Sequence, residues 1–477
     1  MKTFGQDSAP VNVERMTNVF RPYTQDQPLL LPPDLREWLP EGDLALFISD
    51  VVDALDLSAI YRAYERTDGR GQAAYHPALM VKLLLYGYCT GMASSRKIEQ
   101  ATYRDVAFRV LAADQHPDHD SLAAFRQRHL DALAGVFVQV LRLCQTAGLV
   151  KLGHVALDGT KVKANASKHK AMSYARMVQT EARLMQEVQA LLAQATQVDA
   201  TEDTAYGRGR RGDELPAELA RRQSRLAVIR TAKAALEADA KAAAEQQAAE
   251  AQAKVAAREQ REGSAKGRPP TVPVPDQAQP APKAQRNFTD PESRIMKDGA
   301  TKGFEQAYNA QVVVDGHAQV IVACALTQEA TDVEQFLPLV AQIEGNTGQR
   351  PAVVLADAGY FSEHNVTAPA LTGIAVYVPP DRSPPLPLAP GAVPTRAWKS
   401  PAAAAMRELL GTAAGRAVYA LRKSIVEPVF GQIKEIRRFR RFALRGVANV
   451  RAEWQLICGT HNLLKLYRSG WTPAAAR

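Results

Sequence analysis

Three acidic residues far apart in the chain have the type and setting expected of a metal-dependent phosphodiester site. Asp158 lies in ALDGTKVKA, Asp357 ends the apolar run VVLAD, and Glu427 lies in SIVEPVFGQIKEIRRFRRF. Carboxylates that converge repel one another unless cations neutralise them, and hard oxygen ligands suit Mg²⁺ or Mn²⁺. Two such ions can activate a water or a 3′-hydroxyl and stabilise the leaving oxygen. The ordinary alternatives are turn aspartates and a solvated helix charge.

A helical face around Glu427 carries further polar groups. Spacings of four, four and seven residues place these side chains near one face: Tyr419, Lys423, Glu427 and Lys434. Pro428 complicates this helix, because a proline inside it removes the backbone hydrogen bond to residue 424 and forces a kink. We therefore expect either a kink there or a helix that starts near Val426.

Basic residues gather near these acids. An arginine run interleaved with Phe439 and Phe442 comprises Arg437, Arg438, Arg440, Arg441 and Arg445. Its density favours contact with phosphates, with the phenylalanines anchored in the core, over an ordinary amphipathic surface. A second group follows Asp158 and could hold nucleic acid near the acids: Lys161, Lys163, Lys168 and Lys170.

The composition fits a large globular protein with a polyanionic partner. The chain has 477 residues, 59 Lys+Arg against 50 Asp+Glu, and a formal net charge of +9; phosphates neutralised by such charges release counterions. Its four cysteines are widely spaced, which indicates neither a disulfide framework nor a zinc ribbon. We expect no membrane segment and no signal peptide, hence a cytoplasmic protein. The composition of one short segment suits metal ligands, but a polar turn explains it better: His116, Asp118, His119 and Asp120.

The elements that must position these residues change character along the chain. Apolar spacings of three and four residues predict helices over residues 30–149, with Pro77 in a first turn and Asp120 or Ser121 as an N-cap. A helix-turn-helix and an ordinary helical bundle both fit this region. Alternating residues in GHVALDGTKVKANAS predict a strand. An Ala-, Glu- and Lys-rich segment then predicts two antiparallel helices with a break over 198–216, followed by an irregular Pro-rich linker over 268–283.

Beyond this insertion the strand signal returns. Two β-rich runs joined at Asp315-Gly316 predict a hairpin, followed by a helix, the short strand AVVLADAG, the strand IAVYVPP, a Pro- and Ala-rich loop to about Ala405, and two helices. This order predicts a mixed α/β sheet of the ribonuclease H-like type, with a helical N-terminal domain and a long helical insertion after the first strand. In that sheet the first and fourth strands are neighbours, so Asp158 and Asp357 converge.

The chain resembles DDE transposases of bacterial insertion sequences, closest to the family called eleven-eighty-two. The matching segments run in order: HPALMVKLLLYGY, DHDSLAAFR, ALDGTKVKANAS, NFTDPESRIMK, LADAGYF, VEPVFGQIKEIRRFRRFALRG and THNLLKL. The resemblance implies that Asp158, Asp357 and Glu427 are the catalytic metal ligands. It also implies that Tyr419, Arg422 and Lys434 support them. One extra residue separates Arg422 from Glu427, which leaves Arg422 or Lys423 for the basic position.

The resemblance implies an activity as well. A DNA transposase would bind the terminal inverted repeats of its element, cleave DNA with two Mg²⁺ ions (or Mn²⁺), and join the 3′ ends to a target. It would act as a homodimer or larger assembly on double-stranded DNA, at the nucleoid in the bacterial cytoplasm. Alternatives are a metal-dependent nuclease without joining and an inactive DNA-binding repressor. The expected division is a leader (1–29), a helical, DNA-binding N-terminal domain (30–149), the first catalytic strand (150–170), the insertion and linker (171–290), the remaining catalytic domain (291–470) and a tail (471–477).

Overall fold

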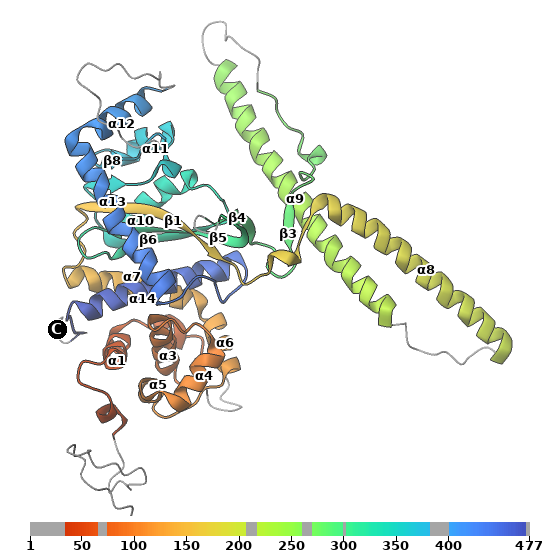
Figure 1. Ribbon diagram of the computed structural model, residues 1–477, viewed down its shortest axis with the longest axis horizontal. Coiled ribbons are helices and arrows are strands. Elements are labelled where there is room, and N and C mark those ends of the chain that lie inside the picture. The colour runs from red at the N-terminus through yellow and green to blue at the C-terminus, as the bar shows by residue number, and fades with distance from the viewer. Residues whose placement is uncertain are drawn as a thin grey trace, which may run out of the picture.

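The computed structural model describes residues 34–64, 74–206, 217–259, 270–298, 302–381 and 400–473. A central sheet carries helices, a group of N-terminal helices lies to one side of it, and a two-helix arm projects away (Figure 1). This arrangement confirms the mixed α/β class. The predicted leader lies outside the described residues, as do residues 474–477 of the predicted tail.

The N-terminal region is helical, as the apolar spacing predicts. A short 3-10 turn, η1 (Leu35–Trp38), precedes α1 (Leu44–Ala54), α2 (Ser58–Tyr61), α3 (Pro77–Cys89), α4 (Ser95–Arg104), α5 (Val106–Leu111), α6 (His119–Arg128) and α7 (Leu130–Thr146). Pro77 occupies the first turn of α3, as expected. The N-cap of α6 is neither Asp120 nor Ser121 but Asp118, whose carboxylate accepts the Ser121 N–H at 2.8 Å.

The sheet places the first and fourth strands of the predicted order side by side. Its path is β4 (Arg294–Lys297), β5 (Phe304–Asp315), β1 (His154–Lys163), β7 (Val353–Leu355) and β8 (Ala375–Tyr377), with β6 (Ile321–Thr327) paired to β5. β5 runs antiparallel to β1, whereas β7 and β8 run parallel to it. A separate two-stranded ladder joins β2 (Ala171–Ser173) to β3 (Gln285–Asn287). The predicted neighbourhood of the two acid-bearing strands is therefore confirmed.

The predicted β5–β6 hairpin forms, but its turn differs from the expected two-residue type. The backbone φ is positive at Gln319 and not at Asp315 or Gly316. The Asp315 side chain is buried, and its carboxylate accepts the N–H groups of Leu152 at 2.6 Å and His317 at 2.9 Å. Asp315 therefore fixes the connection through its side chain, which also ties the hairpin to the segment that enters β1.

Helices of the second half cover the sheet. They are α10 (Phe336–Thr347), α11 (Glu363–Thr367), α12 (Pro401–Gly411), α13 (Ala413–Gly431) and α14 (Val447–Arg468). α12 starts inside the segment predicted as loop to Ala405, because Ser400 caps it through the Ala403 N–H and Pro401 fits its first turn. Short 3-10 turns lie at Val333–Gln335 (η4), Ala358–Tyr360 (η5) and Pro369–Leu371 (η6).

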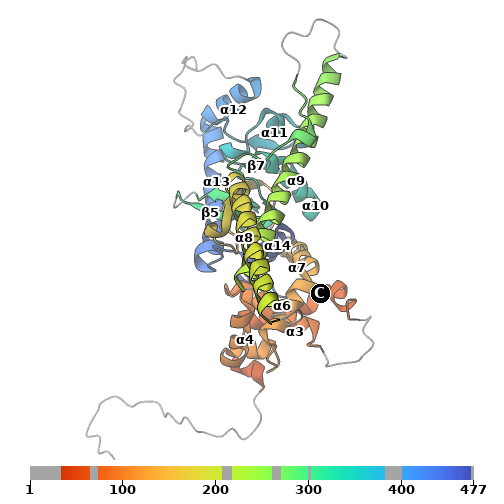
Figure 2. The same ribbon diagram turned by 90° about the vertical axis from the view of Figure 1, so that its right-hand side faces the viewer.

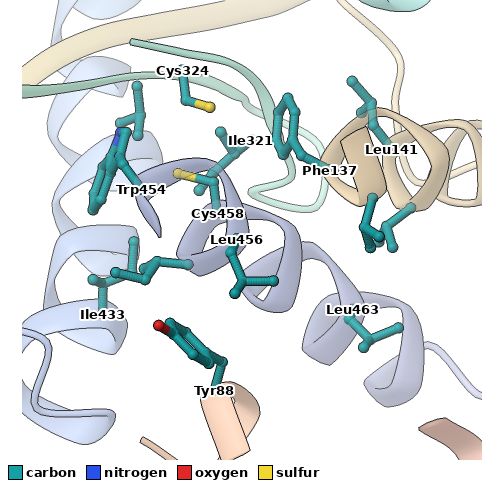
Figure 3. Packing of buried hydrophobic residues seen from close by; sticks show 14 of the residues in the cluster. Tyr88, Phe137, Leu141, Ile321, Cys324, Ile433, Trp454, Leu456, Cys458 and Leu463 are labelled. Atoms are coloured by element: carbon teal, nitrogen blue, oxygen red, sulfur yellow. The ribbon is translucent and has the colours of Figure 1, made fainter. Parts of the chain in front are cut away.

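α14 is the core helix of the whole protein. It packs against α7, α3 and β6, so residues from both ends of the chain meet on it. Figure 3 shows Trp454, Leu456 and Cys458 of this helix among side chains of the sheet and of the N-terminal helices. All four cysteines are free and buried, as expected of small core residues.

Pro428 lies inside α13, so the expectation that the helix starts near Val426 is wrong. The helix continues for three residues beyond the proline and then passes into a π-helical turn, η7 (Gln432–Ile436). The carbonyl of Ser424, which loses its helical donor at Pro428, accepts the side-chain N–H of Gln319 at 2.9 Å. The hairpin loop between β5 and β6 therefore replaces the missing backbone hydrogen bond.

The insertion forms the projecting arm of Figures 1 and 2, with α8 (Tyr174–Tyr206) antiparallel to α9 (Ala217–Glu259). Glu181 of α8 pairs with Arg230 at 2.9 Å and Lys233 at 3.0 Å on α9, above a small apolar core. α8 extends to residue 206, past the predicted start of the break. The Pro-rich linker contains one 3-10 turn, η3 (Pro275–Gln277), held to α9 by a Lys241–Asp276 pair of 2.7 Å.

A buried carboxylate links α14 to the chain that precedes it. Glu453 is 1% exposed, and its oxygens accept the N–H groups of Ala443 at 3.0 Å and Leu444 at 2.9 Å and the Tyr88 hydroxyl at 3.3 Å. Burial raises the pKa of Glu453 above its usual value. The carboxylate thus joins α3 of the N-terminal region to the segment between α13 and α14.

Replacing Glu453 tests this link. Glu453→Ala leaves two part-buried N–H groups and the buried Tyr88 hydroxyl without their acceptor, so we expect the free energy of unfolding to fall by about 3 kcal/mol in a denaturant titration. Glu408→Ala, at an exposed site on α12, should change it by less than ~0.5 kcal/mol. Equal effects of the two substitutions would contradict a structural role for Glu453.

Candidate active site

The sheet register brings Asp158 and Asp357 to the same level on neighbouring strands. Ala156 of β1 is opposite Leu355 of β7, and each aspartate lies two residues beyond its strand partner. Asp357 lies two residues after the end of β7 and caps η5, with its carboxylate accepting the Gly359 N–H at 2.8 Å. The two carboxylates are therefore neighbours at the carboxyl end of β7, as the predicted strand order requires.

Asp158 is a partly buried carboxylate with an arginine as its partner. The Arg422 Nη1 atom of α13 lies 3.0 Å from Asp158 Oδ2, and the Gly159 N–H donates to Asp158 Oδ1 at 2.8 Å. Burial raises the pKa of Asp158 to about 6, the Arg422 charge opposes this rise, and the negative charge of Asp357 adds to it. The site therefore favours added positive charge next to these two carboxylates.

The structure distinguishes Arg422 from Lys423. Arg422 is largely buried and faces Asp158, whereas Lys423 is exposed on α13. Tyr419, one turn before Arg422, is partly buried; burial raises its pKa, and the Arg422 charge opposes this. Of the two candidates for the basic position, Arg422 is the residue that contacts the acidic pair.

Glu427 is not brought together with the two aspartates. It is exposed on α13, five residues after Arg422, which corresponds to roughly 140° around a helix. Within the described residues, no three His, Cys, Asp or Glu side chains lie close enough together to hold a metal ion. The structure thus places Asp158, Asp357 and Arg422 in one site and leaves Glu427 at its surface.

Lys434 contacts β1 directly. Its Nζ atom donates to the Thr160 hydroxyl and, at 2.9 Å, to the Lys161 carbonyl. Burial lowers its pKa, and the positive charges of Arg440 and Lys161 act in the same direction. The π-helical turn η7 carries Lys434, so this turn fixes the end of α13 on the strand that bears Asp158.

A third aspartate near the site was missed in the sequence. Asp332 Oδ1 accepts the side-chain N–H groups of Asn309 at 2.6 Å and Gln311 at 2.7 Å, and lies 3.7 Å from Lys161 Nζ. A Cβ atom at Gly359 would lie 3.0 Å from Asp357 Oδ1 and 3.3 Å from Asp332 Oδ2. The two carboxylates therefore flank the same glycine, whose lack of a side chain leaves room for both.

The sequence around Asp332 does not indicate this role. In the segment TDVEQF, the position of Asp332 predicts a helix N-cap, and the residue does precede the turn η4. Its side chain makes no capping hydrogen bond and instead binds amides of β5. Only the antiparallel pairing of β5 with β1 brings those amides, and hence Asp332, beside Asp158.

Arg437 was expected to contact nucleic acid, and the structure corrects this. Its side chain is 3% exposed, and it donates to the Thr460 hydroxyl at 2.8 Å and the Ile457 carbonyl at 3.1 Å. Desolvation lowers its pKa to about 10. Arg437 instead joins the segment after α13 to α14 and to the Tyr88 carbonyl of α3.

The other basic residues lie beside the end of β1. The Lys163 N–H donates to the Arg440 carbonyl at 3.1 Å, and the Phe442 N–H donates to the Lys163 carbonyl at 2.9 Å. The arginine side chains outside the core are Arg438, Arg440, Arg441 and Arg445. Phe439 and Phe442 are buried, as predicted, so they anchor this surface.

Several of these cations already have partners. Arg440 pairs with Glu435 at 2.5 Å, Lys163 with Glu305 at 3.2 Å, and Arg445 donates to the Asn165 carbonyl at 2.9 Å.

The polar segment 116–120, whose composition suits metal ligands, has ordinary contacts: His119 binds Glu99 at 2.8 Å and Asp118 caps α6. None of the described helices has an apolar stretch long enough to cross a bilayer.

Two parts of the chain match models of known protein families. A family model described as "Transposase domain (DUF772)" matches residues 33–128, and one described as "Transposase DDE domain" matches residues 393–467. The second region includes α13, η7 and α14, and therefore Arg422, Glu427 and Lys434. No curated protein and no solved structure matches the chain. The two matched regions are similar to transposase domains, and together they support a DDE transposase of insertion sequences.

Divalent metal ions are the general cofactor of DDE transposase domains. Asp158 and Asp357 fit such an ion in charge and in placement, because burial and the negative charge of Asp357 both raise the pKa of Asp158 and so favour a nearby cation. At present Arg422 supplies that positive charge. A three-carboxylate site needs one more ligand, and within the described residues no third carboxylate lies close enough to complete it.

Substitution of Arg422 should reveal its role as the counter-charge. Arg422→Ala leaves the partly buried Asp158 carboxylate without its cation, so we expect a loss of about 3 kcal/mol in the free energy of unfolding at pH 8. The neighbouring Lys423→Ala removes an exposed charge and should cost less than ~0.5 kcal/mol. Similar losses in metal-free denaturant titrations would contradict the assignment.

The pH dependence of stability should report Asp158. Its pKa rises from 3.8 to about 6 on folding, so its stabilising contribution is complete below about pH 4 and is lost as the pH rises through 6. In metal-free buffer, the unfolding free energy of the wild type minus that of Asp158→Asn should fall by ~3 kcal/mol between about pH 4 and pH 7. A difference that does not change with pH would show that this carboxyl titrates normally.

Proposed function

We propose that this protein is a DNA transposase that binds the terminal inverted repeats of its element. It cleaves DNA at the element ends and joins the 3′ ends to target DNA. The observation that carries the proposal is the placement of Asp158 and Asp357 at one level of neighbouring parallel strands, in a chain with two transposase regions. We further propose that the sheet is ribonuclease H-like and that the chain belongs to the eleven-eighty-two family.

The proposed metal ligands are Asp158, Asp357 and Glu427. Two Mg²⁺ ions, or Mn²⁺, would supply an activated water or 3′-hydroxyl and stabilise the leaving oxygen. Arg422 balances the buried charge of Asp158, and Lys434 fixes the end of α13 on β1. Glu427 is exposed on the helix that also carries Arg422, and it would complete the site as the third ligand when substrate is bound.

DNA would lie along the basic surface beside β1. The exposed arginines Arg438, Arg441 and Arg445 and the partly exposed Lys163 support this, because the backbone of Arg440 and Phe442 pairs with the strand that carries Asp158. Lys161 and Arg440 would exchange their present acidic partners for phosphates. Tyr419 lies one helical turn from Arg422 and would support the reacting end.

The remaining parts of the proposal follow from this activity. The helical region 30–149 would bind DNA, 150–170 and 291–470 would form the catalytic domain, and 171–290 the insertion. Both ends of an element must be held together for integration, so a homodimer or larger assembly on double-stranded DNA is expected. A bacterial enzyme with this substrate would work at the nucleoid in the cytoplasm.

A second candidate is an inactive DNA-binding repressor. The observation that favours it is the exposed Glu427, which leaves the described residues without a three-carboxylate metal site. A metal-dependent nuclease that cuts without joining uses the same acids and differs only in its products.

Cleavage and joining assays separate these functions. The protein is incubated with end-bearing duplex DNA, with Mg²⁺ or with EDTA, and the products are resolved on denaturing gels. Asp158→Ala, Asp357→Ala and Glu427→Ala should each lower metal-dependent joining by at least about 10³-fold, because each removes one member of a catalytic unit. Glu408→Ala is the matched acidic control and should retain wild-type joining.

The products decide between the candidates. Joined products that disappear in all three variants support transposition, whereas cleaved products alone indicate the nuclease. DNA binding by the wild type without cleavage at any metal concentration would favour the repressor. Retention of joining in Glu427→Ala would remove that residue from the proposed metal ligands.

A further inference from the structure

The arm carries a basic depression that the catalytic site does not use. A cavity of about 330 Å³ is lined by Met172 of β2, Arg225 of α9, and four residues of α8: Arg176, Gln179, Thr180 and Arg183. The lining residues that the structure describes include three arginines and no carboxylate. Every polar side chain there can donate a hydrogen bond, so the cavity suits an anion.

The arginines come from both helices of the arm. Arg176 and Arg183 are seven residues apart on α8, which separates them by two turns, or about 10 Å. Arg225 reaches the same cavity from α9, and all three side chains are exposed. Arg183 also lies 3.6 Å from Glu187, which holds it in place through a solvent-exposed pair. Antiparallel packing of α8 and α9 is therefore what creates the depression.

The position of the cavity relates it to the proposed active site. The chain runs from Lys163 at the end of β1 through the exposed Lys168 and Lys170 of η2 (Lys168–Lys170) into β2, where Met172 lines the cavity. Figure 1 shows the base of the arm next to the end of β1 and the arm extending away from the sheet. A long polyanion bound at the sheet thus meets a basic surface at the base of the arm.

We propose that this cavity binds the phosphodiester backbone of duplex DNA, independently of base sequence, next to the catalytic site. Guanidinium groups bind phosphate oxygens in pairs of parallel hydrogen bonds, and the exposed Gln179 offers a neutral donor between Arg176 and Arg183. Duplex DNA presents about one negative charge per 1.7 Å of its length, so arginines two turns apart can contact the same duplex. This inference rests on the proposed function, because it assumes that DNA is held at the sheet.

Charge removal at the cavity tests the inference. Fluorescence anisotropy would measure binding of a labelled 40-base-pair duplex to the full-length protein over a range of salt concentrations. Arg176→Ala/Arg225→Ala should bind about tenfold more weakly near physiological salt. Its slope of log affinity against log salt should fall in magnitude by about 1.8, the value for two lost phosphate contacts. Element-end and scrambled duplexes should show the same reduction.

A matched variant controls for net charge. Lys254→Ala/Lys283→Ala removes two exposed positive charges that do not line the cavity, and it should keep the wild-type slope. Circular dichroism and melting temperatures establish that both variants are folded, as expected for exposed sites. Slopes that are equal in the two double variants, whether both retained or both reduced, would overturn the inference.

The same data distinguish this inference from the proposed function. If the wild type shows no salt-dependent binding of any duplex, the proposed function itself fails. If the wild type binds and Arg176→Ala/Arg225→Ala binds identically, only the arm site fails. A change in oligomeric mass of that variant by light scattering, with unchanged DNA binding, would assign the cavity to contact between subunits and would also overturn it.

Discussion

A partly buried carboxylate in the middle of the sheet is the constraint on which much of this structure depends. Asp158 lies in a strand paired on both edges, so its charge is partly removed from water and needs a cation. Arg422 supplies that cation only because α13 crosses β1, and Lys434 fastens the far end of the same helix to Thr160 and Lys161. The helix contains Pro428, and the carbonyl that the proline leaves without a donor is bound by Gln319 of the hairpin loop.

The same helix leads into the link between the two ends of the chain. Beyond η7, Arg437 and Glu453 are both buried and bind backbone groups of the segments around α14, and each also contacts Tyr88 of α3. Two buried charges that are held by hydrogen bonds impose one relative placement on their elements, because any other placement leaves them unpaired. The helices α13 and α14 and the N-terminal region are thus held in a fixed arrangement, whereas the arm is attached through β2, β3 and the linker turn η3.

Some individual predictions failed for identifiable physical reasons. Arg437 has the same sequence setting as its exposed neighbours, and only the approach of α14 and α3 turns it into a core residue. Asp332 looks like a helix cap, and only strand pairing between β5 and β1 shows that its carboxylate binds amides beside the site. The choice between Arg422 and Lys423 depends on the rotation of α13 over β1, which adjacent residues of equal charge do not reveal. These are all cases in which partners distant in sequence decide a side chain's role.

The sequence by itself determined the mixed α/β class, the order of the main strands and helices, the two-helix insertion and the resemblance to DDE transposases, although it did not predict the short strands β2, β3 and β4. These properties follow from local periodicity, turn chemistry and motif order, which are written within short segments. It also singled out Asp158 and Asp357, because acids at the ends of neighbouring strands must converge. Only the tertiary structure decided which arginine neutralises Asp158, where Glu427 lies relative to that pair, how Pro428 is accommodated and which basic residues face solvent. Each of these depends on how one element is rotated against another, and that rotation is set by packing between residues hundreds of positions apart.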